Sequence, residues 1–153
     1  MSLCLCVSPR FSEPAMPDLT LTREHDASDA EAVLLRLRDF NVAHAGDPAY
    51  VPLSLFLRDE GGAVAGGLLG DLYYGWLFVR ILWVADEHRG GGHGERLVRA
   101  AEEEARARGC HAMWLDTFSF QAPGFYRRLG FQEFARLDEY PPGHARHFLW
   151  KPL

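Results

Sequence analysis

Apolar and polar residues alternate along the chain with two different periods, and the change of period marks the expected elements. A period of two residues is typical of strands and a period of about 3.6 residues is typical of helices, with glycine- and proline-rich turns between them. Strands are expected over residues 18–24, 51–58, 63–74, 76–84, 112–118, 131–137 and 147–151. Helices are expected over residues 29–42, 93–108 and 123–129. This order mixes hairpin and crossover connections, which predicts a mixed α/β (α+β) domain around one central sheet.

Local sequence signals indicate where the first helix begins and that the strand over residues 76–84 is buried. Ser28 and Glu31 have the spacing of a capping box, in which both side chains satisfy free amides at a helix start. The apolar residues behind them recur at helical spacing, so we expect an amphipathic helix over residues 29–42. Residues 76–84, WLFVRILWV, are almost wholly apolar, which predicts a central strand covered on both faces.

Length and composition indicate one globular domain, which we expect to span residues 18–153. The chain has 153 residues, of which 48% are hydrophobic and 24% are charged, the profile of a protein with a substantial core. Residues 1–17 lack the basic start and the long apolar stretch of a signal peptide. We therefore expect either an N-terminal arm or a natural start at Met16, and a cytoplasmic protein.

Several classes of function are disfavoured. Every apolar run is shorter than the roughly 20 residues that cross a bilayer, so no membrane partner is expected. The net charge of -5 argues against a nucleic-acid partner. Cys4, Cys6 and Cys110 form no disulfide framework. We expect reduced thiols and no metal, with a zinc half-site at Cys4 and Cys6 as the alternative.

The most informative segment is the glycine-rich stretch of residues 89–94, RGGGHG, between the apolar strand and an amphipathic helix. Glycines let backbone amides approach a ligand closely, and free amides at a helix start bind phosphate oxygens. The spacing fits neither the Walker A loop nor the dinucleotide-binding fingerprint, whose last glycine is replaced by Glu95 when counted from Gly90. A phosphate-bearing ligand is therefore expected at this loop, the alternative being a plain tight turn.

Two motifs together resemble the GNAT N-acetyltransferases, in particular small bacterial members. Arg89, Gly92 and Gly94 match the Arg-x-x-Gly-x-Gly loop that binds the acetyl-CoA pyrophosphate in this family. Downstream, residues 121–131, QAPGFYRRLGF, resemble its Asn-x-x-Ala-x-x-Phe-Tyr-x-x-x-Gly-Phe segment. The resemblance covers roughly residues 18–153. It implies the acyl-CoA N-acyltransferase fold, whose mostly antiparallel central sheet is splayed around the cofactor and flanked by helices.

The resemblance implies an enzyme that transfers the acetyl group of acetyl-CoA directly to a primary amine of a small molecule. The loop amides would hold the pyrophosphate, and the strand before the loop would pair with the pantetheine arm. The start of the short helix, where Gln121 stands in place of the family's asparagine, would also contact the cofactor. The cofactor-binding residues expected on this basis are Leu82, Trp83, Val84, Arg89, Gly90, Gly91, Gly92, His93, Gly94, Gln121 and Tyr126.

Tyr126 and Asp116 are the expected catalytic residues. Tyr126 occupies the family's tyrosine position, and with an ordinary pKa of about 10 it is protonated at neutral pH and can protonate the leaving thiolate. The acceptor must lose a proton, because an amine with a pKa of about 10.4 is almost wholly charged at pH 7. Related sequences often carry an acidic base within the segment that corresponds to residues 76–84, where this chain has Arg80. Asp116 is the remaining candidate base, and a structural role for it is an equal alternative.

The resemblance places the acceptor across the splayed strands from the cofactor. The candidate acceptor residues are Asn41, His44, Tyr74, Trp76 and Tyr140. The aromatic rings among them are suited to stack on a flat or cationic acceptor. A position in the core or in a dimer interface is the alternative for Tyr74 and Trp76, and the resemblance allows a homodimer.

Two other functions stay open on the sequence alone. A non-catalytic acyl-CoA-binding sensor or partner module would keep the loop and lack turnover; Arg80 favours this reading mildly and Tyr126 argues against it. A protein that uses the loop for ATP or NAD is disfavoured by the glycine spacing.

Overall fold

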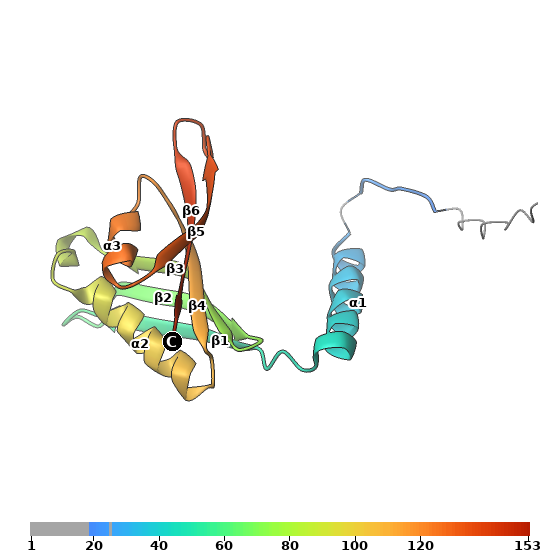
Figure 1. Cartoon of the computed structure of the whole chain (residues 1–153), viewed down its shortest axis with the longest axis horizontal. Helices are drawn as coiled ribbons and strands as arrows, with labels where there is room; N and C mark the ends of the chain where they lie inside the picture. The colour runs from blue at the N-terminus through green and yellow to red at the C-terminus, as the bar shows by residue number, and fades with distance from the viewer. Residues whose placement is uncertain (1–18, 25) are drawn as a thin grey trace, which may run out of the picture. The chain divides into compact units, whose positions relative to one another are not determined.

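The computed structural model describes residues 19–24 and 26–153, and the chain divides into two compact units, residues 1–38 and 39–153 (Figure 1). We describe each unit by itself. The arm expected over residues 1–17, with Cys4, Cys6 and Met16, lies outside the described residues. None of the helices formed by residues 26–153 is long and apolar enough to span a bilayer.

Helix α1 (Ala27–Ala45) begins directly after Asp26. The Asp26 carboxylate oxygen Oδ1 accepts hydrogen bonds from the amide of Ser28 at 2.7 Å and from the amide of Asp29 at 3.1 Å. The hydrogen bond from the Ser28 hydroxyl is the largest cause that lowers the pKa of this carboxyl. The predicted capping box of Ser28 and Glu31 is therefore wrong. Asp26 caps the helix, because a carboxylate accepts its free amides and also complements its positive end.

The strand predicted over residues 18–24 is also wrong, since residues 19–24 have no regular secondary structure. Leu19 and Leu21 alternate with threonines, which is the pattern of a strand. A strand also requires a neighbour that takes up its amide and carbonyl groups, and none of the described strands pairs with this segment.

The unit of residues 39–153 is built on a six-stranded sheet with the order β1-β2-β3-β4-β6-β5. The strands are β1 (Val51–Arg58), β2 (Val64–Tyr73), β3 (Trp76–Val84), β4 (Ala112–Phe118), β5 (Gln132–Asp138) and β6 (Ala145–Pro152). All neighbours are antiparallel except β3 and β4, which are parallel. The mixed α/β class is confirmed, and these six strands lie close to their expected ranges.

Helix α2 (His93–Ala107) packs mainly against β1, β2 and β3 on one face of the sheet (Figure 1). Its buried stripe consists of Leu97, Val98, Ala101 and Ala105. β3 is central, as predicted, but Ile81 and Trp83 on its other face are about half exposed. Full coverage of β3 was therefore a wrong prediction, and the reason is that the end of this strand lines a cavity.

The two parallel strands stay together only briefly. They pair from Trp76 with Ala112 to Val79 with Leu115, which is four residue pairs, and then part. The sheet is thus two antiparallel halves, β1-β2-β3 and β4-β6-β5, joined along this short seam. The splay that the family resemblance implied is present.

A β-bulge in β3 lies at the point where the strands part. Leu69 of β2 faces Ile81 and Gly70 faces Val79, so Arg80 is the extra residue. A bulge bends its strand and increases the local twist. A Cβ on Gly70 would come within 2.6 Å of a carbonyl oxygen of β3, so glycine is what allows the two backbones to approach here.

A buried ion pair fastens α2 to the second half of the sheet. Glu102 of α2 is only 2% exposed, and Lys151 of β6 donates a hydrogen bond to its carboxylate at 2.6 Å. The same ammonium donates to the backbone oxygen of Leu129 at 2.9 Å. Because α2 packs mainly on the first half, this pair connects the two halves across the seam.

We expect Lys151→Met to lower the free energy of unfolding by about 3 kcal/mol, because it leaves the Glu102 carboxylate buried without its main partner. The double variant Glu102→Leu/Lys151→Met should recover most of that loss, since no buried charge remains. Urea unfolding of the three proteins measures both effects.

The matched control is Arg108→Met, which breaks the exposed pair of Glu104 in α2 and Arg108 at its C-cap, 3.5 Å apart. We expect this change to cost less than about 1 kcal/mol. A double variant no more stable than Lys151→Met would contradict the role given to the unpaired charge.

Candidate functional site

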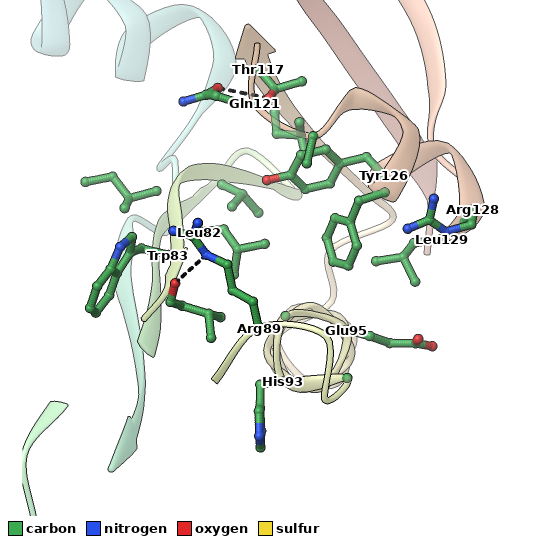
Figure 2. A pocket seen from close by; sticks show the side chains of 18 of the residues that line it. Leu82, Trp83, Arg89, His93, Glu95, Thr117, Gln121, Tyr126, Arg128 and Leu129 are labelled. Atoms are coloured by element: carbon green, nitrogen blue, oxygen red, sulfur yellow. Dashed lines mark hydrogen bonds between the residues drawn. The ribbon is translucent and has the colours of Figure 1, made fainter. Parts of the chain in front are cut away.

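The gap between the parted strands opens into a cavity of about 970 Å³ (Figure 2). It is lined by the end of β3, the glycine loop with the start of α2, the end of β4, and α3 (Pro123–Arg128) with the residues before it. Asp116 lines it, and so do all the expected cofactor residues except Gly91: Leu82, Trp83, Val84, Arg89, Gly90, Gly92, His93, Gly94, Gln121 and Tyr126.

The glycine loop leads from β3 through the short 3₁₀ helix η1 (Asp86–His88) into α2. Gly90 and Gly92 each have a φ of 79°, a left-handed conformation that favours glycine. Gly92 is the N-cap of α2 and offers no side-chain cap. The first amides of α2 are therefore left without a side-chain acceptor, which is the usual setting for an anion at a helix start.

Arg89 ties the end of β3 to this loop. Its Nε donates a hydrogen bond to the backbone oxygen of Val84 at 3.0 Å (Figure 2). Its Nη2 lies 2.7 Å from the Asp86 carboxylate. The guanidinium thus holds the loop in place and keeps a positive charge at the cavity wall.

Tyr126 of α3 lies against the cavity and is 9% exposed. Phe125 and Phe131 pack edge-on against its ring. Burial is the main cause that raises the pKa of this phenol to about 12, and the negative charge of Asp116 adds to the effect. The hydroxyl points into the cavity without a hydrogen bond to the residues drawn in Figure 2. The Tyr126 phenol is therefore protonated at neutral pH.

Asp116 forms an ion pair that the sequence reading missed. The Nε of Arg146, on the neighbouring strand β6, donates a hydrogen bond to Asp116 Oδ2 at 2.6 Å. Arg146 also packs over the rings of Phe118 and Phe148 and donates to the Tyr140 hydroxyl at 3.3 Å. Tyr140, predicted to contact the acceptor, is thus connected to the cavity through this arginine.

Gln121 is held by the end of β4. Its side-chain oxygen accepts hydrogen bonds from the Thr117 hydroxyl at 3.0 Å and from the amide of Phe118 at 2.8 Å (Figure 2). Because the carbonyl end is occupied, the amide nitrogen is the end that remains to donate to a ligand.

None of the five predicted acceptor residues lines the cavity. Trp76 begins β3, at the end of the strand away from the cavity, and packs against His111 and Trp150. Tyr74 lies in the turn just before it. In α1, a ring nitrogen of His44 is hydrogen-bonded to the backbone oxygen of Phe40 at 2.7 Å, and Asn41 is exposed. Their role in acceptor binding stays a prediction.

The cavity also contains residues that no motif position indicated: His88, Glu95 and Arg128. They are sequence neighbours of motif residues, and this was the one sequence signal that could have placed them at the cavity. Within residues 19–24 and 26–153, no three His, Cys, Asp or Glu side chains gather in a way that could hold a metal ion.

Comparison with known proteins assigns the family. The acetyltransferase (GNAT) family model matches residues 15–131. The chain is 46% identical over 140 residues to the blasticidin-S acetyltransferase of Streptomyces morookaense, an alignment covering 88% of this chain and 99% of that protein. It is 36% identical over 130 residues to an acetyltransferase of Agrobacterium fabrum, covering 82% and 94% respectively.

Solved structures agree with this assignment. The crystal structure of an acetyltransferase from Bacillus cereus superposes with a TM-score of 0.83 at 30% identity, over 88% of this chain and 98% of that one. The relatives are named as enzymes, which separates this chain from a non-catalytic CoA-binding module. The chain therefore belongs to the acetyltransferase (GNAT) family, whose acetyl donor is acetyl-CoA.

Proposed function

We propose that this protein is an N-acetyltransferase that moves the acetyl group of acetyl-CoA onto a primary amine of a small molecule by direct attack. The observation that carries the proposal is the meeting of three groups in one cavity: an anion-binding glycine loop, the neutral phenol of Tyr126, and the carboxylate of Asp116. We place the reaction in the cytoplasm.

The names of relatives support a small-molecule acceptor. One relative is named as a blasticidin-S acetyltransferase. Another, from Streptomyces lavendulae, is named as a streptothricin acetyltransferase and is 35% identical over 119 residues, which cover 60% of this chain and 62% of that protein. An antibiotic amine is therefore a reasonable first acceptor to test.

The residues around the cavity fit acetyl-CoA, which supplies an activated acyl group on a thiolate that can leave. The glycines at 90 and 92 leave room beside free amides for a pyrophosphate, and Arg89 adds a positive charge. Within residues 39–153, no strand pairs with the β4-facing edge of β3 beyond Val79, so its amides and carbonyls can hold the pantetheine arm. The Gln121 amide nitrogen is placed to donate to the same ligand.

Tyr126 is the proposed general acid. A pKa of about 12 keeps the phenol protonated throughout the neutral range, so it can donate a proton to the leaving thiolate. General acid catalysis of this kind typically accelerates a reaction by about 10²–10⁴.

Asp116 is the proposed partner of the acceptor amine. Arg146 occupies its Oδ2 and fixes its orientation, which leaves Oδ1 to accept a hydrogen bond from the amine. Removing a proton from an ammonium with a pKa of about 10.4 at pH 7 costs roughly 4–5 kcal/mol. Asp116 holds the acceptor amine beside Tyr126 by a hydrogen bond, accepts the proton that the ammonium loses, and passes it to solvent.

Gly92→Ala should weaken acetyl-CoA binding at least about tenfold, because a side chain at this left-handed N-cap blocks the amides that hold the pyrophosphate. It should also lower the free energy of unfolding by about 1 kcal/mol through backbone strain. Calorimetric titration and thermal unfolding measure the two effects.

Gly109→Ala is the matched control. Gly109 has a φ of 77° and open space around its Cα, like Gly92, but it follows the other end of α2. The Gly109→Ala variant should lose a similar free energy of unfolding through backbone strain and should bind acetyl-CoA with wild-type affinity. Equal affinities of the two variants would argue against the loop as the pyrophosphate site.

Tyr126→Phe should lower kcat about 10²–10³-fold and leave the Kd for acetyl-CoA close to its wild-type value, because the ring contacts remain and only the proton donor is lost. Thiol release with the acceptor that gives the highest activity, together with calorimetric titration, separates the two quantities.

The control for this change is Tyr73→Phe, at the exposed end of β2 that pairs with the start of β3, away from the cavity; it should keep full activity. In the wild type, kcat should not decline up to about pH 10, because the acid has a pKa of about 12. Normal turnover by Tyr126→Phe, or a wild-type decline near pH 8, would contradict the role of Tyr126.

A further inference from the structure

Four charged side chains of alternating sign follow one another across four neighbouring strands. They are Asp71 of β2, Arg80 of β3, Asp116 of β4 and Arg146 of β6. Arg80 Nε lies 2.7 Å from Asp71 Oδ2, and Arg146 Nη2 lies 2.6 Å from Asp116 Oδ2. The row thus consists of two closed ion pairs, one in each half of the sheet.

The row is interrupted at the cavity. Arg80 and Asp116 directly follow Val79 and Leu115, the last residues that pair β3 with β4. Both line the cavity, yet within residues 39–153 no ion pair joins them to each other. A positive and a negative group therefore face a ligand-sized space from its two sides.

Both groups that border this space keep unused hydrogen-bonding capacity. The Arg80 side chain is 48% exposed, and among residues 39–153 its two terminal amino groups donate no hydrogen bond. Asp116 uses Oδ2 for Arg146, and no group in the same range donates to its Oδ1. The cavity wall thus includes a half-exposed guanidinium on β3 and a carboxylate with one unoccupied oxygen on β4.

Asp71 holds Arg80 in place without covering its terminal amino groups. The Tyr50 hydroxyl donates a hydrogen bond to Asp71 Oδ1 at 2.8 Å, so both Asp71 oxygens are occupied. This hydrogen bond is the main cause that raises the pKa of Tyr50, so its phenol stays a donor at neutral pH. The Tyr50–Asp71 contact therefore orients Arg80 for a further ligand.

We propose that the acceptor carries a carboxylate close to the amine that is acetylated, so that it resembles an amino acid. The amine hydrogen-bonds to Asp116 beside Tyr126, and the carboxylate binds the Arg80 fork with two parallel hydrogen bonds. This inference rests on the proposed N-acetyltransferase function and names its substrate class. Arg80 and Asp116 directly follow Val79 and Leu115, the last paired residues, where the strands are still about 4.8 Å apart. We therefore expect only a few covalent bonds between the two charged groups of the acceptor.

The test uses matched acceptors in a thiol-release assay with acetyl-CoA: the common L-amino acids, β-alanine and γ-aminobutyrate, each compared with its own primary amide. The amide keeps the size of the acceptor and removes the negative charge. We expect the best carboxylate acceptor to exceed its amide at least about tenfold in kcat/KM, the usual effect of a charged hydrogen-bonded pair.

In each variant we compare kcat/KM for the carboxylate acceptor with kcat/KM for its primary amide. Arg80→Gln should bring this ratio near one, and Arg80→Lys should keep part of the preference. Arg136→Gln is the control, because Arg136 is 52% exposed and pairs with Asp138 at 2.6 Å on β5. It should keep the wild-type ratio.

Each remaining outcome counts against a different claim. Thiol release with ethanolamine, tyramine or spermidine but with no amino acid, or a preference that survives Arg80→Gln, would overturn the acceptor class and leave the proposed function intact. Failure to bind acetyl-CoA in a calorimetric titration would overturn the proposed function itself.

Discussion

The parting of β3 from β4 after four residue pairs is the constraint on which both the fold and the site depend. Parallel strands that stay paired leave no free backbone between them, so a cavity inside a sheet requires that pairing stops. The bulge at Arg80 redirects β3, whereas β4 continues in register with β6 over seven residue pairs. The sheet gives up backbone hydrogen bonds at this point and gains a binding surface.

Such an interruption has to be compensated elsewhere. Helix α2 packs mainly on the first half of the sheet, and the buried pair of Glu102 and Lys151 connects it to the second half. The same helix begins at the glycine loop, so the element that joins the two halves also supplies the amides at the cavity. The charged residues at the gap are divided in the same way. Arg80 pairs with Asp71 within the first half of the sheet, and Arg146 pairs with Asp116 within the second half.

Local patterns were enough to predict most of the elements. The apolar run of β3, the stripe of α2 and the glycine loop were visible because they depend on residues near each other in sequence. The strand predicted over residues 18–24 was wrong because an alternating sequence does not by itself supply a neighbouring strand to pair with. The predicted Ser28 cap was wrong because the Asp26 carboxylate, two residues earlier, is a stronger acceptor for the helix amides.

The site was predictable on its cofactor side and less so on its acceptor side. Loop residues and Tyr126 belong to motifs, whereas the pairing of Asp116 with Arg146 depends on the position of β6 beside β4, which no local pattern encodes. Trp76 belongs to the strand that lines the cavity but lies at its opposite end, and Tyr74 lies in the turn before it. The partner of Arg80 was likewise hidden, since Asp71 reaches it only across the bulged β2–β3 hairpin.

The central claim is that the donor occupies the gap between the parted strands. Hydrogen–deuterium exchange with and without acetyl-CoA tests it most directly. We predict slower exchange at residues 80–84 and 90–94 when acetyl-CoA is bound, and unchanged exchange in the exposed strand β5. Unchanged exchange at residues 80–84, with protection elsewhere in the chain, would contradict the claim.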